Sequence, residues 1–570
     1  MVTSLNPSHT ISRHCDLPTD TLRIPRFCYG NSERGSIFQR VSSDLDEKFC
    51  WHPTSPSFPA FSSLQFSGRR GRPREKAVLA SANLQHRVYM SPRETLRSGG
   101  VASDTVRYVA NVPNDDQVIP RMYTVDEVEK HSTPKDCWVI VHGKVYDVTS
   151  FVPLHPGGNM IWVKAGGECT QLFDSYHPLR TRAVLEKYCI GEVKRVSGDE
   201  RKIIVYESEQ KGDFYLECKL VVERWFKESK KDPRVHPEMY VKSLVILIGV
   251  AVCHYCSFFL TDSILVSSLF AIFHGIWKAE VGVSIQHDAN HGAYGKSRGF
   301  LHAMQLTLDA VGASSFMWRQ QHVVGHHAYT NVDGVDPDIR CAPEKDIRRV
   351  NEYQPHESYH RLQHIYLVFA YGLLSLKSCF IDDFNAVASG EIGWVKIAKF
   401  TKGEAATFWS SKILWAFYYL FLPMRFGMHS EVRTAALIVI TEFVTGWLLA
   451  FMFQVAHVVG EVQFFKLSKE GGLNLSWAES QLCSSADFSH GSWFWTHFSG
   501  GLNYQVVHHL FPGVCHCHYP DLAPLIQKVA KEYGLKYVVY PSFSTALLAH
   551  FRHLKNIGHR TRVPSLKTIG

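Results

Sequence analysis

The sequence lacks the usual marks of a secreted, disulfide-stabilised or nucleic-acid-binding protein. Its 14 cysteines are scattered without a framework of paired spacings, which is typical of reduced thiols in a cytosolic or stromal compartment. No apolar core follows Met1, so a secretory signal is not predicted. The net charge of +8 is modest, and no dense stripe of Lys and Arg occurs. This charge distribution suits loops that face an anionic membrane surface better than a surface that binds nucleic acid.

Aromatic and apolar residues, by contrast, are abundant. Hydrophobic residues make up 45% of the 570 positions, and the chain contains 35 Phe, 24 Tyr and 13 Trp. This composition is typical of a membrane protein whose aromatic side chains gather at the membrane surfaces. The mean hydropathy is nevertheless slightly negative, so regions in water must offset the apolar ones.

Four apolar segments, each near the twenty residues that cross a hydrocarbon core, predict transmembrane helices. Their approximate ranges are 240–260, 263–285, 408–426 and 435–455. Only Thr261 and Asp262 separate the first two, which therefore form a predicted helical hairpin, while Lys278 and Glu442 interrupt the apolar pattern. Each pair of segments returns the chain to its starting side, so both termini lie on one face of the membrane. The apolar stretch 365–376 is too short to span and is predicted to lie in the interface.

Three clusters of polar residues stand next to these segments. They contain His287 and His291 in HDANH, His322, His326 and His327 in HVVGHH, and Gln505, His508 and His509 in NYQVVHHLFP. Histidines four residues apart share one face of a helix, about 6 Å apart along its axis, so His322 and His326 are predicted to point at one site. His327 would lie about 100° round the helix, where it could reach a second metal ion. Neutral imidazole suits iron, zinc, copper and nickel, so the clusters predict a metal site.

Residues 122–195 are predicted to form a separate soluble unit with two further histidines. The unit opens with a capping-box pattern at Thr124, and CWVIVHGKVYDV alternates like a hairpin with Gly143 at its turn. In FVPLHPGG, His155 precedes two glycines that let a flat group approach the backbone closely. His177 follows in LFDSYHPLR.

These motifs resemble two known families. The three clusters match the histidine boxes of the membrane fatty-acid desaturases. Gln505 stands where most members have the first histidine of the third box, which is typical of the front-end branch and of its Δ4/Δ5-like algal and protist members. The unit at 122–195 resembles cytochrome b5, whose haem iron lies between two histidines. Together the resemblance covers roughly residues 120–557.

The resemblance implies a fold class and a domain order. The expected fold is an N-terminal α+β cytochrome b5-like haem domain, followed by an all-α membrane desaturase domain. That second domain should have four transmembrane helices and a di-iron cap that faces the cytosol or stroma. The expected parts are a disordered segment (1–118), the haem domain (119–197), a charged, helical linker (198–238), the desaturase domain (239–557) and a tail (558–570).

The first 118 residues are rich in Ser, Arg and Pro and have no periodic apolar pattern. Four arginines between 69 and 74 precede a small-residue site at 78–80, as at the end of a plastid transit peptide. Asp44 and Asp46 argue against this, because transit peptides are poor in acidic residues. The alternative is a disordered tail with no targeting role. We expect an integral multi-pass protein in a plastid membrane, with the endoplasmic reticulum as the alternative.

By resemblance, His155 and His177 are the axial ligands of haem b. A haem with both axial positions filled by side chains transfers electrons and does not bind oxygen. The implied ligands of two iron ions are His287, His291, His322, His326, His327, His457, His508 and His509. His457 is included because desaturases carry a ligand histidine at a similar place, just past the fourth apolar segment. Gln505 is expected in the catalytic site, where it departs from the histidine of most members. Its amide is a poor iron ligand, so it either hydrogen-bonds within the site or leaves a coordination position open.

Other polar residues near the boxes have less defined roles. Asp288, Asn290 and Asp336 either orient histidines or cap local structure, and the sequence does not choose between these roles. His497, in WTHFSGG, is a weaker candidate ligand. No box surrounds His302, His356, His360 or His364.

The implied activity is that of an oxygen-dependent acyl-lipid desaturase. Breaking an unactivated C–H bond is beyond any side-chain acid, base or nucleophile, so a metal cofactor must carry the oxidation. Electrons are expected to pass from NADH, through a cytochrome b5 reductase and the haem, to the two irons. A front-end enzyme places a cis double bond between an existing one and the carboxyl end of a polyunsaturated chain, with Δ5 or Δ4 favoured. The expected partners are the bilayer, an acyl lipid and the reductase, without nucleic acid.

Several alternatives share some of these features. A sphingolipid long-chain-base Δ8 desaturase or a Δ6 acyl desaturase would perform the same reaction on another substrate, and only lipid analysis separates them. In a haem-fused hydroxylase the boxes are spaced differently. A simple electron carrier would leave the histidine boxes without a purpose, and a zinc transporter would consume no oxygen.

Overall fold

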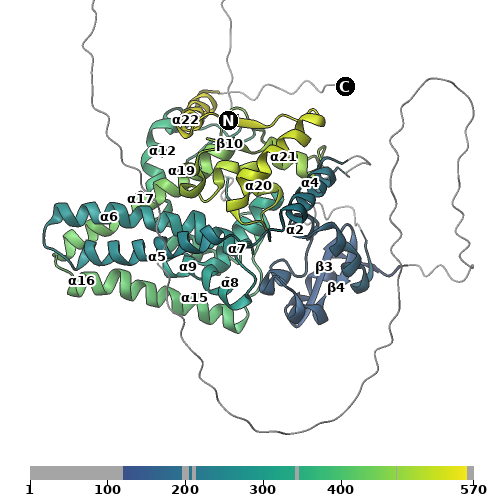
Figure 1. The fold of residues 1–570 in the computed structure, drawn as a ribbon, viewed down its shortest axis with the longest axis horizontal. Helices are drawn as coiled ribbons and strands as arrows, with labels where there is room; N and C mark the ends of the chain where they lie inside the picture. Colours follow the sequence, from purple (N-terminus) through teal and green to yellow (C-terminus); the bar gives the residue numbers. More distant parts are fainter. Residues whose placement is uncertain (1–119, 195–203, 208–212, 340–345, 470, 561–570) are drawn as a thin grey trace, which may run out of the picture. The chain divides into compact units, whose positions relative to one another are not determined.

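A computed structural model describes residues 120–194, 204–207, 213–339, 346–469 and 471–560 (Figure 1). The predicted targeting segment 1–118 and most of the predicted tail 558–570 lie outside these residues. Within them, an α+β unit is followed by a predominantly helical part. The predicted fold class is therefore confirmed.

The α+β unit is built on a five-stranded sheet with the order β1-β5-β4-β3-β2. The strands are β1 (Met122–Tyr123), β2 (Ser132–Thr133), β3 (Asp136–Val141), β4 (Lys144–Asp147) and β5 (Cys189–Val193). β3 and β4 form the predicted hairpin, in which His142 and Gly143 both adopt positive φ, as a tight two-residue turn requires. β1 pairs with β5 in parallel, so the first and last strands of the unit are neighbours in the sheet.

Short helices cover this sheet and carry the two histidines of the unit. They include α1 (Val125–Glu129), η1 (Thr149–Leu154), η2 (Gly158–Trp162), α2 (Thr170–Tyr176) and α3 (Arg182–Leu185). The predicted capping box is present at α1, where the Glu127 N–H donates to Thr124 Oγ1 and the Thr124 N–H donates to Glu127 Oε2. His155 follows η1 and His177 follows α2, so both histidines stand at helix ends that face each other.

The described part of the predicted linker includes a packed helix, α4 (Phe214–Ser229). Asp213 caps its first turn by accepting the Tyr215 N–H at 2.7 Å. The buried face of α4 includes Phe214, Cys218 and Val222, which pack in one core with α21 (Tyr519–Glu532). This part of the linker is therefore held against the helical domain.

Three of the four predicted apolar segments correspond to helices long and apolar enough to cross a membrane. They are α5 (Pro237–Phe258), the continuous run Ile264–Asn290 and α17 (Glu431–His457). The run Ile264–Asn290 consists of α6 (Ile264–Glu280), η5 (Val281–Ile285) and α7 (Gln286–Asn290). α5 and α6 form the predicted hairpin, and α17 packs along α6.

The remaining predicted span, 408–426, differs from these three. It lies in a helical run of α15 (Lys402–Trp415), η9 (Ala416–Phe421) and α16 (Leu422–Phe426), which is less apolar and extends beside α5 and α6 in Figure 1. The stretch 365–376, predicted to lie in the interface, belongs instead to two helices, Ser358–Gly372 and Leu374–Ser389, that meet at a bend of 59°. Together these two helices are apolar enough for a broken span or a re-entrant loop. The described residues thus contain three helices that are long and apolar enough to cross a membrane, or up to four if the bent pair forms one span.

The charges that interrupt the apolar segments pair with each other inside the helical bundle. Lys278 of α6 forms a buried ion pair with Glu442 of α17. The same carboxylate accepts hydrogen bonds from Tyr419 Oη at 2.6 Å and from Ser375 Oγ at 2.5 Å. Because a charge among apolar helices is stable only with partners, this network fixes four segments around one carboxylate.

The remaining helices bring the histidine boxes together. They include η6 (Arg319–His326), α11 (His327–Tyr329), α18 (Trp477–Cys483), α20 (Gln505–Leu510) and α22 (Phe543–His559). α20 packs against α18 and α21, and α22 packs on α17. The site described next lies where η6 and α20 meet the ends of α7 and α17.

Candidate metal centre

All the box histidines converge in one buried cluster. His287 lies in α7, His291 ends that helix, and His457 is the last residue of α17. The others come from η6, α11 and α20, and they are His322, His326, His327, His508 and His509. Each of these histidines is at most 5% exposed.

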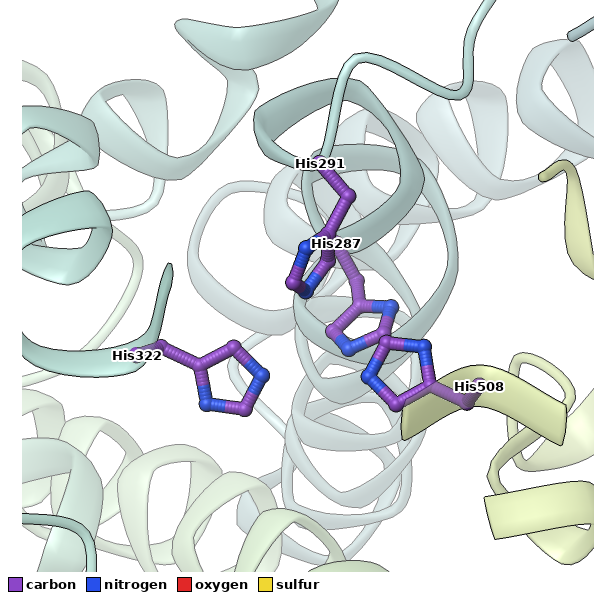
Figure 2. Close-up of side chains that lie close together, drawn as sticks. All are labelled: His287, His291, His322 and His508. Carbon is purple, nitrogen blue, oxygen red and sulfur yellow. The ribbon is translucent and has the colours of Figure 1, made fainter. Parts of the chain in front are cut away.

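One group within the cluster consists of His287, His291, His322 and His508. Each offers one ring nitrogen, and these nitrogens all lie within 4.8 Å of one another. Figure 2 shows the four rings pointing toward a common space from three directions. In the described part of the chain, Nε2 of His287, His291 and His508 is buried without a hydrogen-bond partner. Buried polar atoms are nearly always paired, so this group has the features of a metal site.

A second group consists of His326, His457 and His509, and their ligand nitrogens also lie within 4.8 Å of one another. His327 stands between the two groups, because it forms a third set with His508 and His509. Gln505 lies inside the second group, with its Nε2 2.8 Å from His457 Nε2 and 3.1 Å from His509 Nε2. Rotation of the amide by 180° would place its oxygen, instead of its nitrogen, beside these two Nε2 atoms. The oxygen could then face a cation or accept a hydrogen bond from a ring N–H.

The sequence predicted that His322 and His326 point at one site, but the structure assigns them to different groups. Their rings lie 5.1 Å apart, but His322 joins the first group and His326 the second. The reason is that Arg319–His326 is π-helical. In a π-helix, hydrogen bonds join residues five apart, so the side chains of such residues lie close together. His322 and His327 accordingly have their Nε2 atoms 3.2 Å apart.

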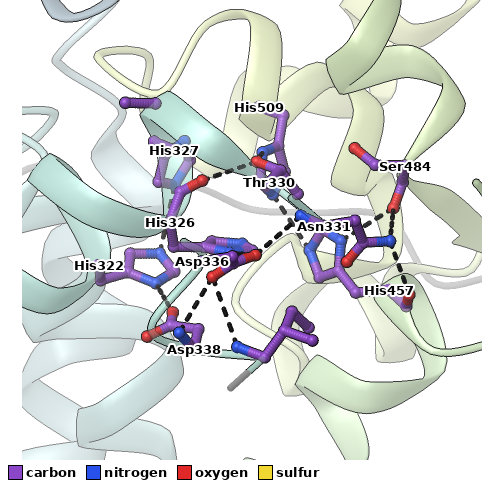
Figure 3. A network of polar contacts seen from close by, with 12 residues as sticks. His322, His326, His327, Thr330, Asn331, Asp336, Asp338, His457, Ser484 and His509 are labelled. Atoms are coloured by element: carbon purple, nitrogen blue, oxygen red, sulfur yellow. Dashed lines mark hydrogen bonds and ion pairs between the residues drawn. The ribbon is translucent and has the colours of Figure 1, made fainter. Parts of the chain in front are cut away.

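Two carboxylates orient the histidines of η6. His322 Nδ1–H donates to Asp338 at 2.5 Å, and His326 Nδ1–H donates to Asp336 at 2.9 Å (Figure 3). Such a bond fixes the ring and leaves Nε2 for a metal. The expectation that Asp336 can orient a histidine is met. Asp338 was missed, although it stands only two residues further along the sequence.

Neutral groups orient other rings in the same way. His457 Nδ1–H donates to the carbonyl of Ser484 at 3.1 Å, and His509 Nδ1–H donates to Gln481 Oε1 at 2.8 Å. His508 Nδ1 lies 3.2 Å from Tyr519 Oη, and His291 Nδ1 lies 2.5 Å from Tyr176 Oη. No motif in the sequence marks these partners, because they come from other segments of the chain.

The other polar residues of the first box have structural roles. Asp288 accepts hydrogen bonds from Nδ1 and the backbone N–H of His516 at 2.8 and 3.1 Å. Asn290 Oδ1 accepts a hydrogen bond from Arg319 at 2.8 Å. These contacts tie the box to the loop before α21 and to η6. Of the two roles left open for these residues, the structure therefore favours the structural one.

Burial keeps most of these imidazoles neutral, which is the form that binds a metal. It lowers the pKa of His291, His327, His508 and His509 well below the usual value. It also lowers the pKa of His322 to about 4, against the opposing effect of Asp338. At His326 burial acts in the same direction, but the carboxylate of Asp336 outweighs it and raises the pKa.

The two histidines of the α+β unit form a separate candidate site. The rings of His155 and His177 lie 6.0 Å apart between their centres, which leaves room for one metal ion between them. Nδ1 of His155 lies 3.3 Å from the Gly158 carbonyl, and Nδ1 of His177 lies 2.9 Å from the Phe173 carbonyl. A Cβ at Gly157 would lie 2.8 Å from His155 Cε1, so any other residue there would displace the imidazole ring. Burial lowers the pKa of His155 to about 4, so the arrangement fits a haem held by two neutral imidazoles.

Among the described residues, His302, His356, His360, His364 and His497 do not belong to the two groups of this cluster. His497 lies with His516 and Cys517 in another group, where the Lys242 ammonium is 3.2 Å from His516 Nε2. His302, His356 and His360 bond to nearby side-chain or backbone oxygens, as ordinary structural histidines do.

Known proteins resemble both parts of this chain. The family model "Fatty acid desaturase" matches residues 263–541, and the family model "Cytochrome b5-like Heme/Steroid binding domain" matches residues 124–194. An acyl-lipid (8-3)-desaturase of Physcomitrium patens is 52% identical over 476 residues, which cover 82% of this chain and 98% of that protein. The Delta(5) fatty acid desaturase A of Dictyostelium discoideum is 35% identical over 447 residues, covering 77% and 94%. An sn-1 linoleoyl-lipid 6-desaturase of Synechocystis is 33% identical over 339 residues, covering 59% and 93%.

Proposed function

We propose that this chain makes its double bond at the Δ5 position. The chain belongs to the fatty acid desaturase family and carries a fused cytochrome b5-like domain. Members of this family are oxygen-dependent oxidoreductases. The cytochrome b5 domain binds haem, and desaturases use two iron ions. The family membership rests on a relative that is 52% identical to this chain and is covered over 98% of its own length.

The proposal for the iron site rests on one observation, the difference in hydrogen bonding between the Nδ1 and Nε2 atoms of the histidine rings. Many Nδ1 atoms are held by oxygens, while the Nε2 atoms of His287, His291, His326 and His508 face the cluster without a partner among the described residues. The proposed ligands are His287, His291, His322, His326, His327, His457, His508 and His509. When bound, two irons would supply the oxidising power, drawn from O2, that removes two hydrogens from adjacent carbons. The protein contributes neutral ligands held in place and a buried site.

Gln505 is proposed to line this site without binding iron. Its side chain is fully buried and lies between Nε2 of His457 and Nε2 of His509. An amide can donate a hydrogen bond, and an imidazole in the same place would compete for the metal. We infer that Gln505 leaves one coordination position open on the side of His457.

For the haem domain, we propose His155 and His177 as the axial ligands. Both Nδ1 atoms are bonded to backbone carbonyls, so both Nε2 atoms remain for iron. A haem bound in this way carries electrons without binding oxygen. The proposed electron source is NADH, through a separate cytochrome b5 reductase.

The names of several relatives support the Δ5 position. Those from Physcomitrium patens and Mortierella alpina, at 52% and 32% identity, are called acyl-lipid (8-3)-desaturases. We read this name as a new bond three carbons from Δ8 toward the carboxyl end, which is Δ5. The Delta(5) desaturase of Dictyostelium discoideum has the same position in its name. The acyl-lipid (7-3)-desaturase of Rebecca salina, whose name we read as Δ4, is less similar, at 29% identity.

The same names favour a substrate esterified in a membrane lipid. We therefore propose a polyunsaturated acyl chain of a glycerolipid rather than a free acid. The N-terminal segment favours a plastid membrane for the enzyme, and the endoplasmic reticulum is the alternative.

A fatty-acid profile in yeast tests this function. The chain and its His326→Ala variant would be expressed with polyunsaturated acids whose first double bond is at Δ7, Δ8 or Δ9. We expect a new bond at Δ5 in the Δ8 acid, located by mass spectrometry, and no product from His326→Ala with its haem spectrum intact. The variant loses product because one proposed ligand of the second histidine group is missing.

Other outcomes would correct the proposal. A new bond at Δ4 or Δ6 would overturn the position but keep the front-end reaction. A Δ8 bond in long-chain bases would overturn the substrate class. Normal product from His326→Ala would overturn the ligand set.

A further inference from the structure

One outer partner of the histidine cluster belongs to the haem domain. Tyr176 Oη lies 2.5 Å from Nδ1 of His291, and the two rings are nearly parallel, at 18°. Tyr176 is the last residue of α2, and the next residue is His177, the proposed haem ligand. One residue therefore touches the proposed iron site while its neighbour in the chain faces the haem site.

Other contacts hold α2 in this place. Tyr215 of α4, which is 3% exposed, has its hydroxyl 3.2 Å from the carbonyl of Asp174 in α2 and 2.8 Å from the carbonyl of Leu510 in α20. Gln320 of η6 donates to the carbonyl of Val163 in the haem domain at 3.1 Å. The element that carries the second box is thus bonded to the haem domain directly, and the element that carries the third box is linked to it through α4.

The chain also leaves space for the tyrosine ring. A Cβ built at Gly513 would lie 3.2 Å from Tyr176 Cδ1, which is closer than side chains normally pack. Gly513 stands three residues after the end of α20, in the segment FPG after the third box. A glycine here lets the backbone approach the ring, so the position of Tyr176 depends on both domains.

From these contacts we propose that Tyr176 is a positioning residue of the iron site, supplied by the haem domain. This inference rests on the proposed role of His291 as an iron ligand. With Nε2 of His291 turned to the metal, Nδ1–H donates to the Tyr176 hydroxyl and fixes the ring. Tyr519 performs the same task for His508 from within the helical domain. The iron site is complete only when the haem domain is docked, and docking places the haem ligand one residue from the contact.

The test uses full-length Tyr176→Phe, purified with haem and iron, which removes only the hydroxyl. We expect normal haem content and a normal haem spectrum, but iron release to a chelator that is about 10- to 100-fold faster, the usual cost of losing such a partner. Reoxidation of prereduced haem in the presence of oxygen and substrate, followed by absorbance, should slow by a similar factor. A purely structural role would not change this spectroscopic rate while haem and fold stay intact.

Matched variants separate this inference from the proposed function. Tyr519→Phe should accelerate iron release as Tyr176→Phe does, without involving the haem domain. Tyr188→Phe, a tyrosine that packs on Phe151 inside the haem domain, should change neither measurement. Gly513→Ala, which displaces the ring without removing the hydroxyl, should again slow haem reoxidation.

The possible contradictions are distinct. Normal iron release and haem reoxidation in Tyr176→Phe would overturn this inference alone, provided that His291→Ala loses iron. If His291→Ala retains its iron, the ligand set fails and this inference fails with it. Loss of haem from Tyr176→Phe would also overturn the inference, because the effect would then come from damage to the haem domain.

Discussion

At the scale of single residues, the site depends on what holds Nδ1 of each histidine. The carboxylates of Asp336 and Asp338, the amide of Gln481 and the hydroxyl of Tyr519 each bond one ring. These bonds set which nitrogen carries the proton and where Nε2 points. A histidine box without them would contain the right residues in the wrong orientation.

Asp338→Asn tests this dependence at one position. The amide keeps the size of the carboxylate but loses its charge, so the Nδ1–H bond from His322 weakens. We expect a loss of activity or iron affinity of about 10- to 100-fold, measured as product formed per iron-loaded enzyme and as iron retained against a chelator. The control is Asp521→Asn, at an exposed carboxylate paired with Lys231, which should change neither. Unaltered iron retention in Asp338→Asn would show that His322 needs no charged partner.

At the scale of elements, two features set the geometry of the cluster. The π-helical turn of η6 sends His322 and His326 to different groups. The buried pair of Lys278 and Glu442 fixes α6 against α17. His287 lies in α7, which continues the run of α6, and His457 is the last residue of α17. A polar contact among apolar helices therefore helps to align the metal ligands.

Lys278→Met tests the role of this pair. The change removes the ammonium and leaves the Glu442 carboxylate buried with only hydroxyl partners, which should lower the free energy of unfolding by about 3–5 kcal/mol. The readout is the midpoint of thermal unfolding in detergent. The double variant Lys278→Met with Glu442→Gln should recover part of the loss, because no charge then remains buried. Lys377→Met, which breaks an exposed pair with Asp382, should cost about 0–1 kcal/mol. Equal midpoints for Lys278→Met and Lys377→Met would contradict the expectation.

At the scale of the whole molecule, electron supply and oxidation are joined in one chain. The haem domain is bonded to the helical domain through α4, η6 and the contact between Tyr176 and His291. In the proposed function, this fusion would keep the electron donor next to its acceptor, so the transfer from haem to iron would need no second protein. The reductase that supplies the haem is the proposed external partner.

His155→Ala tests this arrangement. Loss of one proposed axial ligand should remove the haem spectrum and abolish NADH-dependent turnover, while the iron content stays normal. Product should return in part when a separate electron carrier is supplied. His142→Ala is the control, since His142 lies in the same domain but pairs with Asp174 on the surface. Retention of a normal haem spectrum in His155→Ala would refute the assignment.

The sequence by itself determined the parts of this protein whose signals are local. The capping box at Thr124, the hairpin turn at Gly143 and three long apolar helices follow from propensity and periodicity over a few neighbouring residues. The histidine boxes are local in the same sense, because their residues stand close together in the chain. The bent pair around residue 373 was not foreseen, since a bend of 59° depends on packing against other helices.

Only the tertiary structure decided how these parts form a site. It sorted the histidines into groups, placed Gln505 between His457 and His509, and brought Tyr519 and Tyr176 into contact with His508 and His291. These contacts join residues from distant segments, whose meeting depends on the packing of whole helices and domains. A sequence pattern records spacing along the chain, whereas ring orientation depends on partners that only folding brings together.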